Sequence, residues 1–193
     1  HKPSCAAGRF TFTAPNETAD RVCRDIQVCV AGRYQAAAPG VSSDRMCSDC
    51  VVGQYQSLEN AQECVACTPG KFRDMSQPAS SSESVACRTC GTGRYQDVAG
   101  QTSCVQCAAG KFRTSAAPSS PEDVACNVCG AGRYQDSAGQ LSCLKCSAGK
   151  FRTSEPPESS EILACRDCEQ GYFQPAEEQL SCIACPVGKK RDR

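Results

Sequence analysis

Cysteine is the residue with the most chemical potential in this chain, because 19 of the 193 residues are cysteines and only one is histidine. Thiols at this density form disulfides or bind zinc. The spacing C-x2-C-x13-C-x2-C, from Cys87 to Cys107, approaches that of a four-cysteine zinc ribbon. However, 19 cysteines cannot all be used in groups of four, and no His joins them. We therefore expect disulfides and no metal.

Catalytic chemistry has little support in the sequence. The single His is residue 1, and a terminal imidazole is not held in place as a general base. The carboxylates of Glu122, Asp123 and Glu158 lie in Ser- and Pro-rich segments, where solvation is their ordinary role. Disulfide formation would also consume the thiols that a cysteine nucleophile needs. We predict that the chain is not an enzyme, with no catalytic residue and no cofactor.

The composition indicates that disulfides, and not a large apolar core, hold the fold. Leu, Ile, Val and Phe make up about 14% of the chain, below the roughly 20% that an ordinary core needs, and there is no Trp. The 21 Lys and Arg balance the 21 Asp and Glu, so nucleic acid and anionic membranes are not expected partners. No apolar run approaches the roughly 18 residues that would span a bilayer.

The sequence repeats with a period of 39 residues. The blocks that begin at Cys87, Cys126 and Cys165 nearly superimpose, and the block before them, from Cys47, is one residue longer. In stacked repeats of this kind each unit contacts its neighbours, and we expect each half of a repeat to touch only the halves next to it in the sequence. The predicted domains are a divergent segment, three complete cysteine-rich repeats and a truncated fourth repeat, with the boundaries 1–46, 47–86, 87–125, 126–164 and 165–193.

Each repeat consists of two halves that share the pattern C-x-x-G-x-[Tyr/Phe], followed by a loop and a closing cysteine. The glycine predicts a backbone with positive φ, which other residues resist. The aromatic ring is expected to fold over the disulfide of its own half and to form a miniature core with it. In the short halves, Asp-x-Ala-Gly at 97–100 and 136–139 predicts a turn between two short strands. The glycines are Gly8, Gly32, Gly53, Gly70, Gly93, Gly110, Gly132, Gly149, Gly171 and Gly188, and the rings are Phe10, Tyr34, Tyr55, Phe72, Tyr95, Phe112, Tyr134, Phe151 and Phe173.

The half-repeat favours a sequential order of disulfides, in which each half closes on itself. The pairs would be Cys5–Cys23, Cys29–Cys47, Cys50–Cys64, Cys67–Cys87, Cys90–Cys104, Cys107–Cys126, Cys129–Cys143, Cys146–Cys165 and Cys168–Cys182. Cys185 would remain unpaired, because its half is cut off at Arg193. The alternative is an interleaved order, which pairs Cys87 with Cys104 and Cys90 with Cys107.

Two surface features could take part in binding. Lys-Phe-Arg recurs in the long halves at 71–73, 111–113 and 150–152, and an extended strand would place each Lys and Arg on one face, opposite the Phe. These cations would form a basic ladder for acidic glycans or, as the sequence favours, solvated charges balanced by loop acids such as Glu83, Glu122, Asp123 and Glu161. The Ser- and Pro-rich loops could carry O-linked glycans, and Asn16 begins an Asn-Glu-Thr sequon for N-glycosylation.

The unit CxxCxxGxYQ…GQxxCxxCxxGKF resembles the ephrin-receptor-like cysteine-rich repeats, and the resemblance runs from Cys5 to Gly188. The segment 1–46 is more similar to the first module of tumour-necrosis-factor-receptor cysteine-rich domains. Both kinds of module occur in large secreted and cell-surface proteins. The expected fold class is therefore small disulfide-rich repeats that form an elongated rod of short β-hairpins and loops with almost no helix. The resemblance does not transfer a binding site.

The predicted function is that of a structural or spacer segment in a large extracellular or cell-surface protein, such as a filament-forming surface or flagellar-appendage protein of a protist or alga. Its partners would be other extracellular proteins, copies of itself or glycans, without nucleic acid and without membrane insertion in this segment. The alternative is a receptor or adhesin ectodomain that recognises a protein or glycan. A binding site would then be expected in the divergent first third, from Cys5 to Cys47.

Overall fold

Each half-repeat folds into a small two-stranded ladder that one disulfide closes. The structure is a computed structural model that describes residues 4–17, 19–79, 82–114, 119–153 and 160–189. The strand that follows the glycine pairs with the strand at the closing cysteine, so that Tyr95 faces Val105 and Arg94 faces Gln106 in an antiparallel register. The short strands predicted from the sequence are thus present, and each pairs only within its own half.

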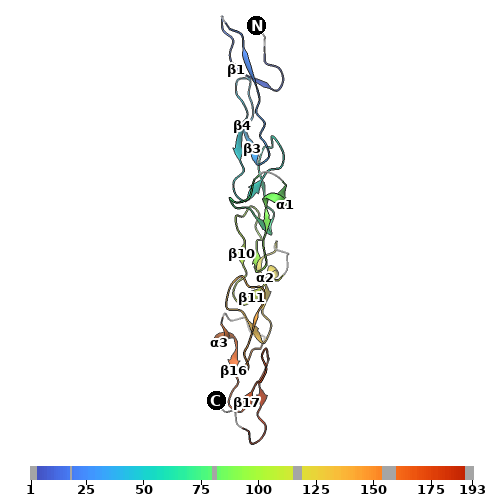
Figure 1. Cartoon of the computed structure of the whole chain (residues 1–193), viewed down its shortest axis with the longest axis vertical. Helices are drawn as coiled ribbons and strands as arrows, with labels where there is room; N and C mark the ends of the chain where they lie inside the picture. The colour runs from blue at the N-terminus through green and yellow to red at the C-terminus, as the bar shows by residue number, and fades with distance from the viewer. Residues whose placement is uncertain (1–3, 18, 80–81, 115–118, 154–159, 190–193) are drawn as a thin grey trace. The chain divides into compact units, whose positions relative to one another are not determined.

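The first two ladders are longer than the others, and both contain an irregularity in their register. They pair β1 (Arg9–Thr13) with β2 (Val22–Asp25) and β3 (Arg33–Ala37) with β4 (Met46–Asp49). The later ladders have two residues in each strand. Their strands β10, β11, β16 and β17 are labelled in Figure 1. They pair β5 (Gln54–Tyr55) with β6 (Val65–Ala66), β7 (Lys71–Phe72) with β8 (Arg88–Thr89), β9 (Arg94–Tyr95) with β10 (Val105–Gln106), β11 (Lys111–Phe112) with β12 (Asn127–Val128), β13 (Arg133–Tyr134) with β14 (Leu144–Lys145), β15 (Lys150–Phe151) with β16 (Arg166–Asp167) and β17 (Tyr172–Phe173) with β18 (Ile183–Ala184).

The long halves contain one helical turn each, directly before the closing cysteine. These turns are α1 (Glu83–Ala86), α2 (Glu122–Ala125) and α3 (Glu161–Ala164), labelled in Figure 1. In α1 the N–H of Cys87 donates to the carbonyl of Glu83 at 2.8 Å, which ends the turn at the disulfide. The sequence predicted almost no helix, and these single turns agree with that prediction, although their position was not foreseen.

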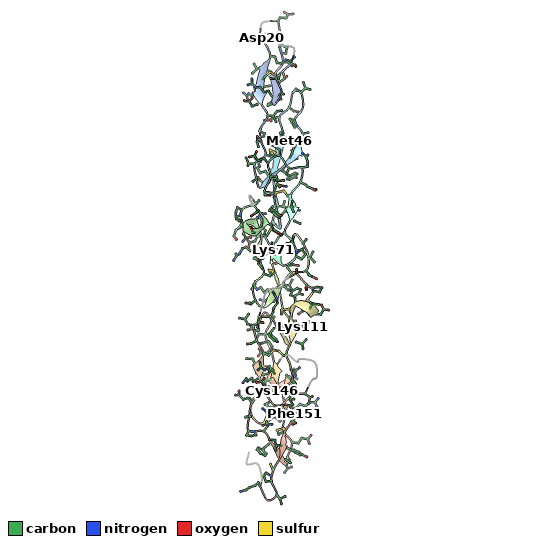
Figure 2. All side chains as sticks on the ribbon, turned by 90° about the vertical axis from the view of Figure 1, so that its right-hand side faces the viewer. Asp20, Met46, Lys71, Lys111, Cys146 and Phe151 are labelled. Atoms are coloured by element: carbon green, nitrogen blue, oxygen red, sulfur yellow. A yellow bond between two sulfur atoms is a disulfide. The ribbon has the colours of Figure 1, made fainter. Side chains whose placement is uncertain are left out.

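The nine disulfides join the pairs of the sequential order, and they appear as yellow bonds in Figure 2. Cys87 is bonded to Cys67 and Cys104 to Cys90, so the interleaved order is not the one found. These cysteines are therefore not free to bind zinc, and no group of three or more potential metal ligands occurs among the described residues. Cys185 is half-buried and is not in a disulfide.

The ten glycines of the C-x-x-G pattern all have positive φ, between +71° and +89°, which confirms the prediction. At Gly93 the reason is twofold. Its φ is +71°, and a Cβ atom there would lie 2.1 Å from the carbonyl oxygen of Gly139 in the following repeat. Glycine is thus required both by the turn and by the close approach of another backbone.

The chain divides into two compact units, His1–Arg88 with Ala99–Ser103, and Thr89–Val98 with Cys104–Arg193. In the first unit the largest fully buried side chains are Cys29 and Cys67. In the second unit they are Cys107, Cys126, Cys146 and Cys165. Sulfur atoms thus occupy the interior of each unit, as expected for a chain with few large apolar residues.

Candidate functional site

The rings of two short halves pack against the next disulfide along the chain. Tyr134 belongs to the half closed by Cys129–Cys143, but it contacts the Cys146–Cys165 disulfide and Ala164 of α3. Tyr55, two repeats earlier, makes the equivalent contact with the Cys67–Cys87 disulfide. These contacts with the next disulfide were not predicted, since each ring was expected over the disulfide of its own half. The single turn of α3 brings a small alanine over the next disulfide, which leaves room there for the ring.

Three buried arginines, Arg73, Arg113 and Arg152, link each long half to the short half before it. We call them the coupling arginines. The Arg113 side chain is only 2% exposed, and its guanidinium donates to the carbonyls of Gly91 (3.4 Å) and Arg94 on either side of the preceding glycine turn. Burial lowers the pKa of Arg113 below its ordinary value. This charged donor supplies hydrogen bonds to two backbone carbonyls of the preceding half, and the carbonyl of Gly91 also accepts the N–H of Arg94 at 3.3 Å.

The backbone of Arg113 extends the same connection in both directions. Its carbonyl accepts the N–H of Gly93 at 3.0 Å, in the half before, and its own N–H donates to Gln140 at 3.1 Å, in the half after. Arg73 and Arg152 make the corresponding backbone bonds in their own surroundings. One residue therefore connects three successive halves, and it does so in each of the three complete repeats, 47–86, 87–125 and 126–164.

The coupling arginines correct the prediction of a basic ladder. Each strand ends at the Phe, so the Arg that follows leaves the strand direction and is buried. The lysines, in contrast, meet acids as expected. Lys71 pairs with Glu83 at 2.9 Å and Lys111 with Glu122 at 3.5 Å. Lys150 pairs at 3.6 Å with Asp167, an acid that the sequence analysis did not name.

Glu83 shows how these acids hold the long halves together. Its carboxylate accepts hydrogen bonds from the N–H of Thr68 (2.8 Å) and the hydroxyl of Thr68 (2.5 Å), and it pairs with Lys71. Burial opposes ionisation, but the hydrogen bonds from Thr68 and Lys71 outweigh it and lower the pKa of Glu83 to about 2. The first residue of α1 thus fixes the turn after the opening cysteine of its half.

In the short halves a buried glutamine holds the loop of its own half together. The sequence analysis did not identify this glutamine as a structural residue. The Gln135 amide donates to the carbonyl of Ser142 at 2.7 Å and accepts the N–H of Ser137 at 3.1 Å, so that it closes its own loop. The same residue type is buried at the same position in the other short halves, as Gln56, Gln96 and Gln174. The signal was present, because Gln follows the ring in the short halves where Arg follows it in the long halves.

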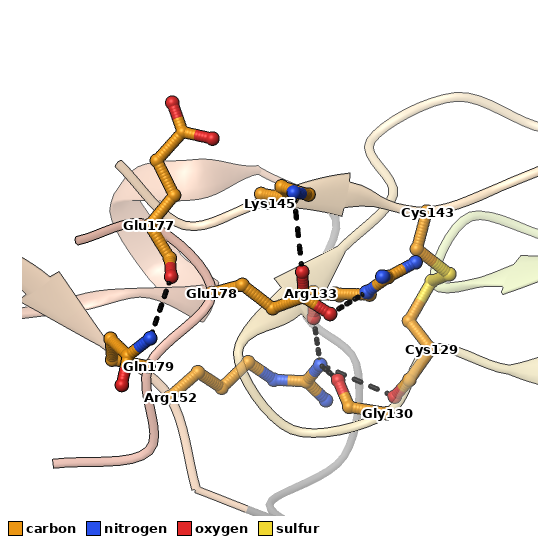
Figure 3. Close-up of polar contacts among 9 residues, drawn as sticks. All are labelled: Cys129, Gly130, Arg133, Cys143, Lys145, Arg152, Glu177, Glu178 and Gln179. Carbon is orange, nitrogen blue, oxygen red and sulfur yellow. Dashed lines mark hydrogen bonds and ion pairs between the residues drawn. A yellow bond between two sulfur atoms is a disulfide. The ribbon is translucent and has the colours of Figure 1, made fainter. Parts of the chain in front are cut away.

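Glu178 occupies the turn position where the two preceding short halves have glycine (Figure 3). Its φ is +62°, an unfavourable value for a residue with a side chain. Its backbone lies against Gly132, where a Cβ atom would be 2.7 Å away, and its carboxylate binds Arg133 and Lys145. The hydrogen bond from Arg133 is the main cause that lowers the pKa of Glu178. A loop thus reaches back over two halves, contrary to the expectation that halves touch only their nearest neighbours.

Grooves on the described surface include one in each unit that concerns a candidate site. One, in the first unit, has a volume of about 350 Å³ and lies in the divergent first third, between Cys5 and Cys23. It has no aromatic lining, and its two arginines are engaged internally, Arg9 with Asp25 at 2.9 Å and Arg21 with the hydroxyl of Thr11 at 2.9 Å. The other, of about 280 Å³, lies in the second unit and is lined by two aromatic rings and by charged side chains.

The remaining candidate residues are placed as follows. Asn16 is exposed in the loop between β1 and β2, where its side-chain oxygen accepts the N–H of Ala19 at 2.7 Å. Asp123 is exposed on α2, whereas Glu122 is half-buried beside Lys111. Glu158 and large parts of the Ser- and Pro-rich loops lie outside the described residues, so the prediction of O-glycosylation there stays a prediction.

Comparison with known families agrees with this architecture. The family model described as tyrosine-protein kinase ephrin type A/B receptor-like matches residues 77–123, 119–162 and 158–193. These matches cover more than half of the chain, and the chain belongs to this family of cysteine-rich repeats. A comparison with curated proteins found no significant match. The similarity of segment 1–46 to tumour-necrosis-factor-receptor modules lies outside the matched residues.

Repeats of this family form a non-catalytic module of receptor-type ectodomains. Nine disulfides in one chain are also typical of the oxidising environment outside the cell. In the part of the chain that the structure describes, no helix is long and apolar enough to cross a bilayer. The class of the protein is thus that of an extracellular, disulfide-stapled repeat domain.

Proposed function

We propose that this chain is a spacer segment of a larger extracellular protein, in which each repeat fixes the orientation of the next. The observation that carries the proposal is the recurrence of the same coupling contacts. Arg73, Arg113 and Arg152 each donate to backbone carbonyls of the half before and accept a glycine N–H from it. A spacer needs such repetition, whereas a binding site needs particular residues at one place.

The energetics favour a stiff connection between successive halves. A flexible linker would leave the C-x-x-C joints exposed to solvent without contacts across them. Here the N–H of Cys107, just after such a joint, donates at 2.9 Å to the carbonyl of Gly93 in the half before. Together with the buried guanidinium of Arg113, this bond resists bending at the joint. The spacer would therefore hold whatever it carries at a defined distance and direction.

The test is a measurement of ¹⁵N relaxation on the second unit of the intact, oxidised chain. Repeats that form one stiff body tumble with one common rotational diffusion tensor, and the amides at the joints show no additional motion. We expect this result for Cys107 and Cys146, the first residues after two joints, and we expect Arg152→Met to introduce motion at the joint before Cys146 only. Separate diffusion tensors for successive repeats in the unchanged protein would contradict the proposal.

A receptor or adhesin ectodomain is the second candidate, and the groove with aromatic lining in the second unit favours it. The two functions are compatible, because a stiff segment can also carry a ligand site. N-glycosylation at Asn16 is a further part of the proposal, since the residue is exposed and begins a sequon in a chain of secretory type. The partners of the chain, whether other proteins, copies of itself or glycans, are likewise proposed.

A further inference from the structure

The last repeat departs from the earlier ones at positions that come together in space. Asp167, Glu169 and Tyr172 stand where the preceding repeat has Val128, Gly130 and Arg133. The repeat before that has Thr89, Gly91 and Arg94 at the same positions. All three departing residues line the groove of about 280 Å³, together with Phe151, Arg166, Ser181 and Cys182. Because these unusual residues all line one groove, we infer that the groove has a role that the earlier repeats lack.

The ladder of β15 and β16 forms one wall of this groove. Phe151 faces Arg166 across the ladder, so these two side chains lie on the same face. Tyr172 follows the next glycine turn, and its side chain is 45% exposed. In the preceding repeat the equivalent Arg133 pairs with Glu178. The replacement of arginine by tyrosine therefore removes a paired cation and adds a second accessible ring to the groove.

The charges around the groove argue against a charged ligand. A cation would meet Arg166 and the nearby Lys150, and an anion would meet the carboxylates of Asp167 and Glu169. Asp167 already has a partner in Lys150 at 3.6 Å. A neutral ligand with hydroxyl groups meets neither repulsion, because a hydroxyl both donates to a carboxylate and accepts from a guanidinium.

We propose that this groove binds a neutral pyranose unit of a glycan. Its rings, Phe151 and Tyr172, would cover the apolar face of the sugar, and Arg166, Glu169 and Ser181 would exchange hydrogen bonds with its hydroxyl groups. Ligand pockets commonly combine an apolar or aromatic lining with a few polar groups and have volumes of about 300–1,000 Å³. A groove of about 280 Å³ lies just below that range, which suits one sugar ring rather than an extended oligosaccharide.

The test uses the intact, oxidised chain labelled with ¹⁵N and four neutral probes, the methyl pyranosides of glucose, galactose, mannose and N-acetylglucosamine. Each is titrated separately while the backbone amide shifts are recorded. We expect at least one probe to shift the amides of residues 166–172 in a saturable manner. The equivalent residues 127–133 of the preceding repeat, which have no second ring, serve as an internal control and should not respond.

Two variants make the test specific. Tyr172→Arg restores the residue of the preceding repeats and should weaken binding of the responding probe at least tenfold. Unchanged amide shifts in the other repeats would confirm that the variant is folded. Arg94→Tyr changes the equivalent position of an earlier repeat and should leave binding unchanged. The absence of saturable shifts with all four probes would overturn the proposal. So would a response of residues 166–172 to N-acetylarginine amide or to a sulfated glycoside that exceeds the response to the neutral probes.

Discussion

Replacement of Arg113 by methionine is the sharpest test of the coupling between halves. Methionine fills a similar length of space without donors or charge, so the carbonyls of Gly91 and Arg94 lose the guanidinium donor of a residue that is only 2% exposed. The carbonyl of Gly91 keeps the N–H of Arg94 at 3.3 Å. A hydrogen bond to a charged group contributes about 1.5–3 kcal/mol. The contact with Gly91, at 3.4 Å, is the weaker of the two. We therefore expect a loss of about 2–4 kcal/mol in the free energy of opening at this joint.

Native-state hydrogen exchange is the appropriate measurement, because the disulfides keep the chain cross-linked when a joint opens. A loss of about 2–4 kcal/mol corresponds to exchange that is faster by about 30-fold to several hundred-fold. The amides to follow are those of Gly93 and Cys107, which bond across the joint at 3.0 and 2.9 Å. A disulfide map of the variant should be unchanged. The residues of the next joint, such as Cys146, should exchange as in the unchanged protein.

Lys111→Met is the matched control for Arg113→Met. It removes a cation from the same segment, but Lys111 only forms an ion pair with Glu122 at 3.5 Å near the surface. Such pairs contribute about 0–1 kcal/mol, so exchange should accelerate by no more than about fivefold. Equal effects of the two variants would refute the coupling role of Arg113. A uniform acceleration over the whole chain would refute the claim that the contact acts locally.

Three further predictions follow from single residues. Gly93→Ala should open the turn at Gly139, because residue 93 has a φ of +71° and its new Cβ would lie 2.1 Å from the Gly139 carbonyl oxygen. We expect faster hydrogen exchange of the Gly139 amide. Unchanged exchange would show that the backbone adapts to the alanine. Because the pKa of Glu83 is lowered to about 2 from 4.5, its stabilisation is complete above about pH 4.5 and is lost as the pH falls through about 2. A ¹³C titration of the carboxyl should show this midpoint, and Lys71→Met should raise it. Asn16→Gln should abolish a mass that peptide N-glycosidase removes from the protein secreted by eukaryotic cells; an equal mass in both proteins would count against glycosylation.

The sequence correctly predicted the glycine turn and the disulfide of each half. The C-x-x-G pattern requires a turn at Gly93 whatever surrounds it, and the recurrence of the half-repeat favours the Cys90–Cys104 disulfide for the same reason. Both depend on residues that are close in the chain. The extended shape expected of such repeats stays a prediction. A radius of gyration well above the roughly 16 Å of a compact chain of this length, measured by small-angle scattering, would support it.

Contacts between halves were predicted poorly, because a period in the sequence does not say which faces meet. Arg113 was expected on a strand face in solvent, but the strand ends at Phe112 and the guanidinium reaches back to the preceding turn. Tyr134 was expected over its own disulfide, but α3 places Ala164 where the ring fits better. Strand alternation was thus applied beyond the end of a two-residue strand, and the short helical turn that redirects the ring has no helical period to reveal it.

Glu178 shows why identical and departing positions of the repeat carry different information. The turn that it occupies has a positive φ, and glycine fills it at Gly100 and Gly139, so a glutamate there costs about 1–2 kcal/mol of backbone strain. Its carboxylate offsets part of this cost by binding Arg133 and Lys145. The joint before the last repeat is therefore held by charged side chains in addition to the common contacts.

Identical residues such as the coupling arginines explain how any repeat is joined to the next, whereas residues that depart from the pattern distinguish the last repeat from the others. A failure of glycan binding at Tyr172 would consequently leave the proposed spacer function intact. Flexible joints would contradict the spacer function but not the glycan site, which the glycoside titration tests separately.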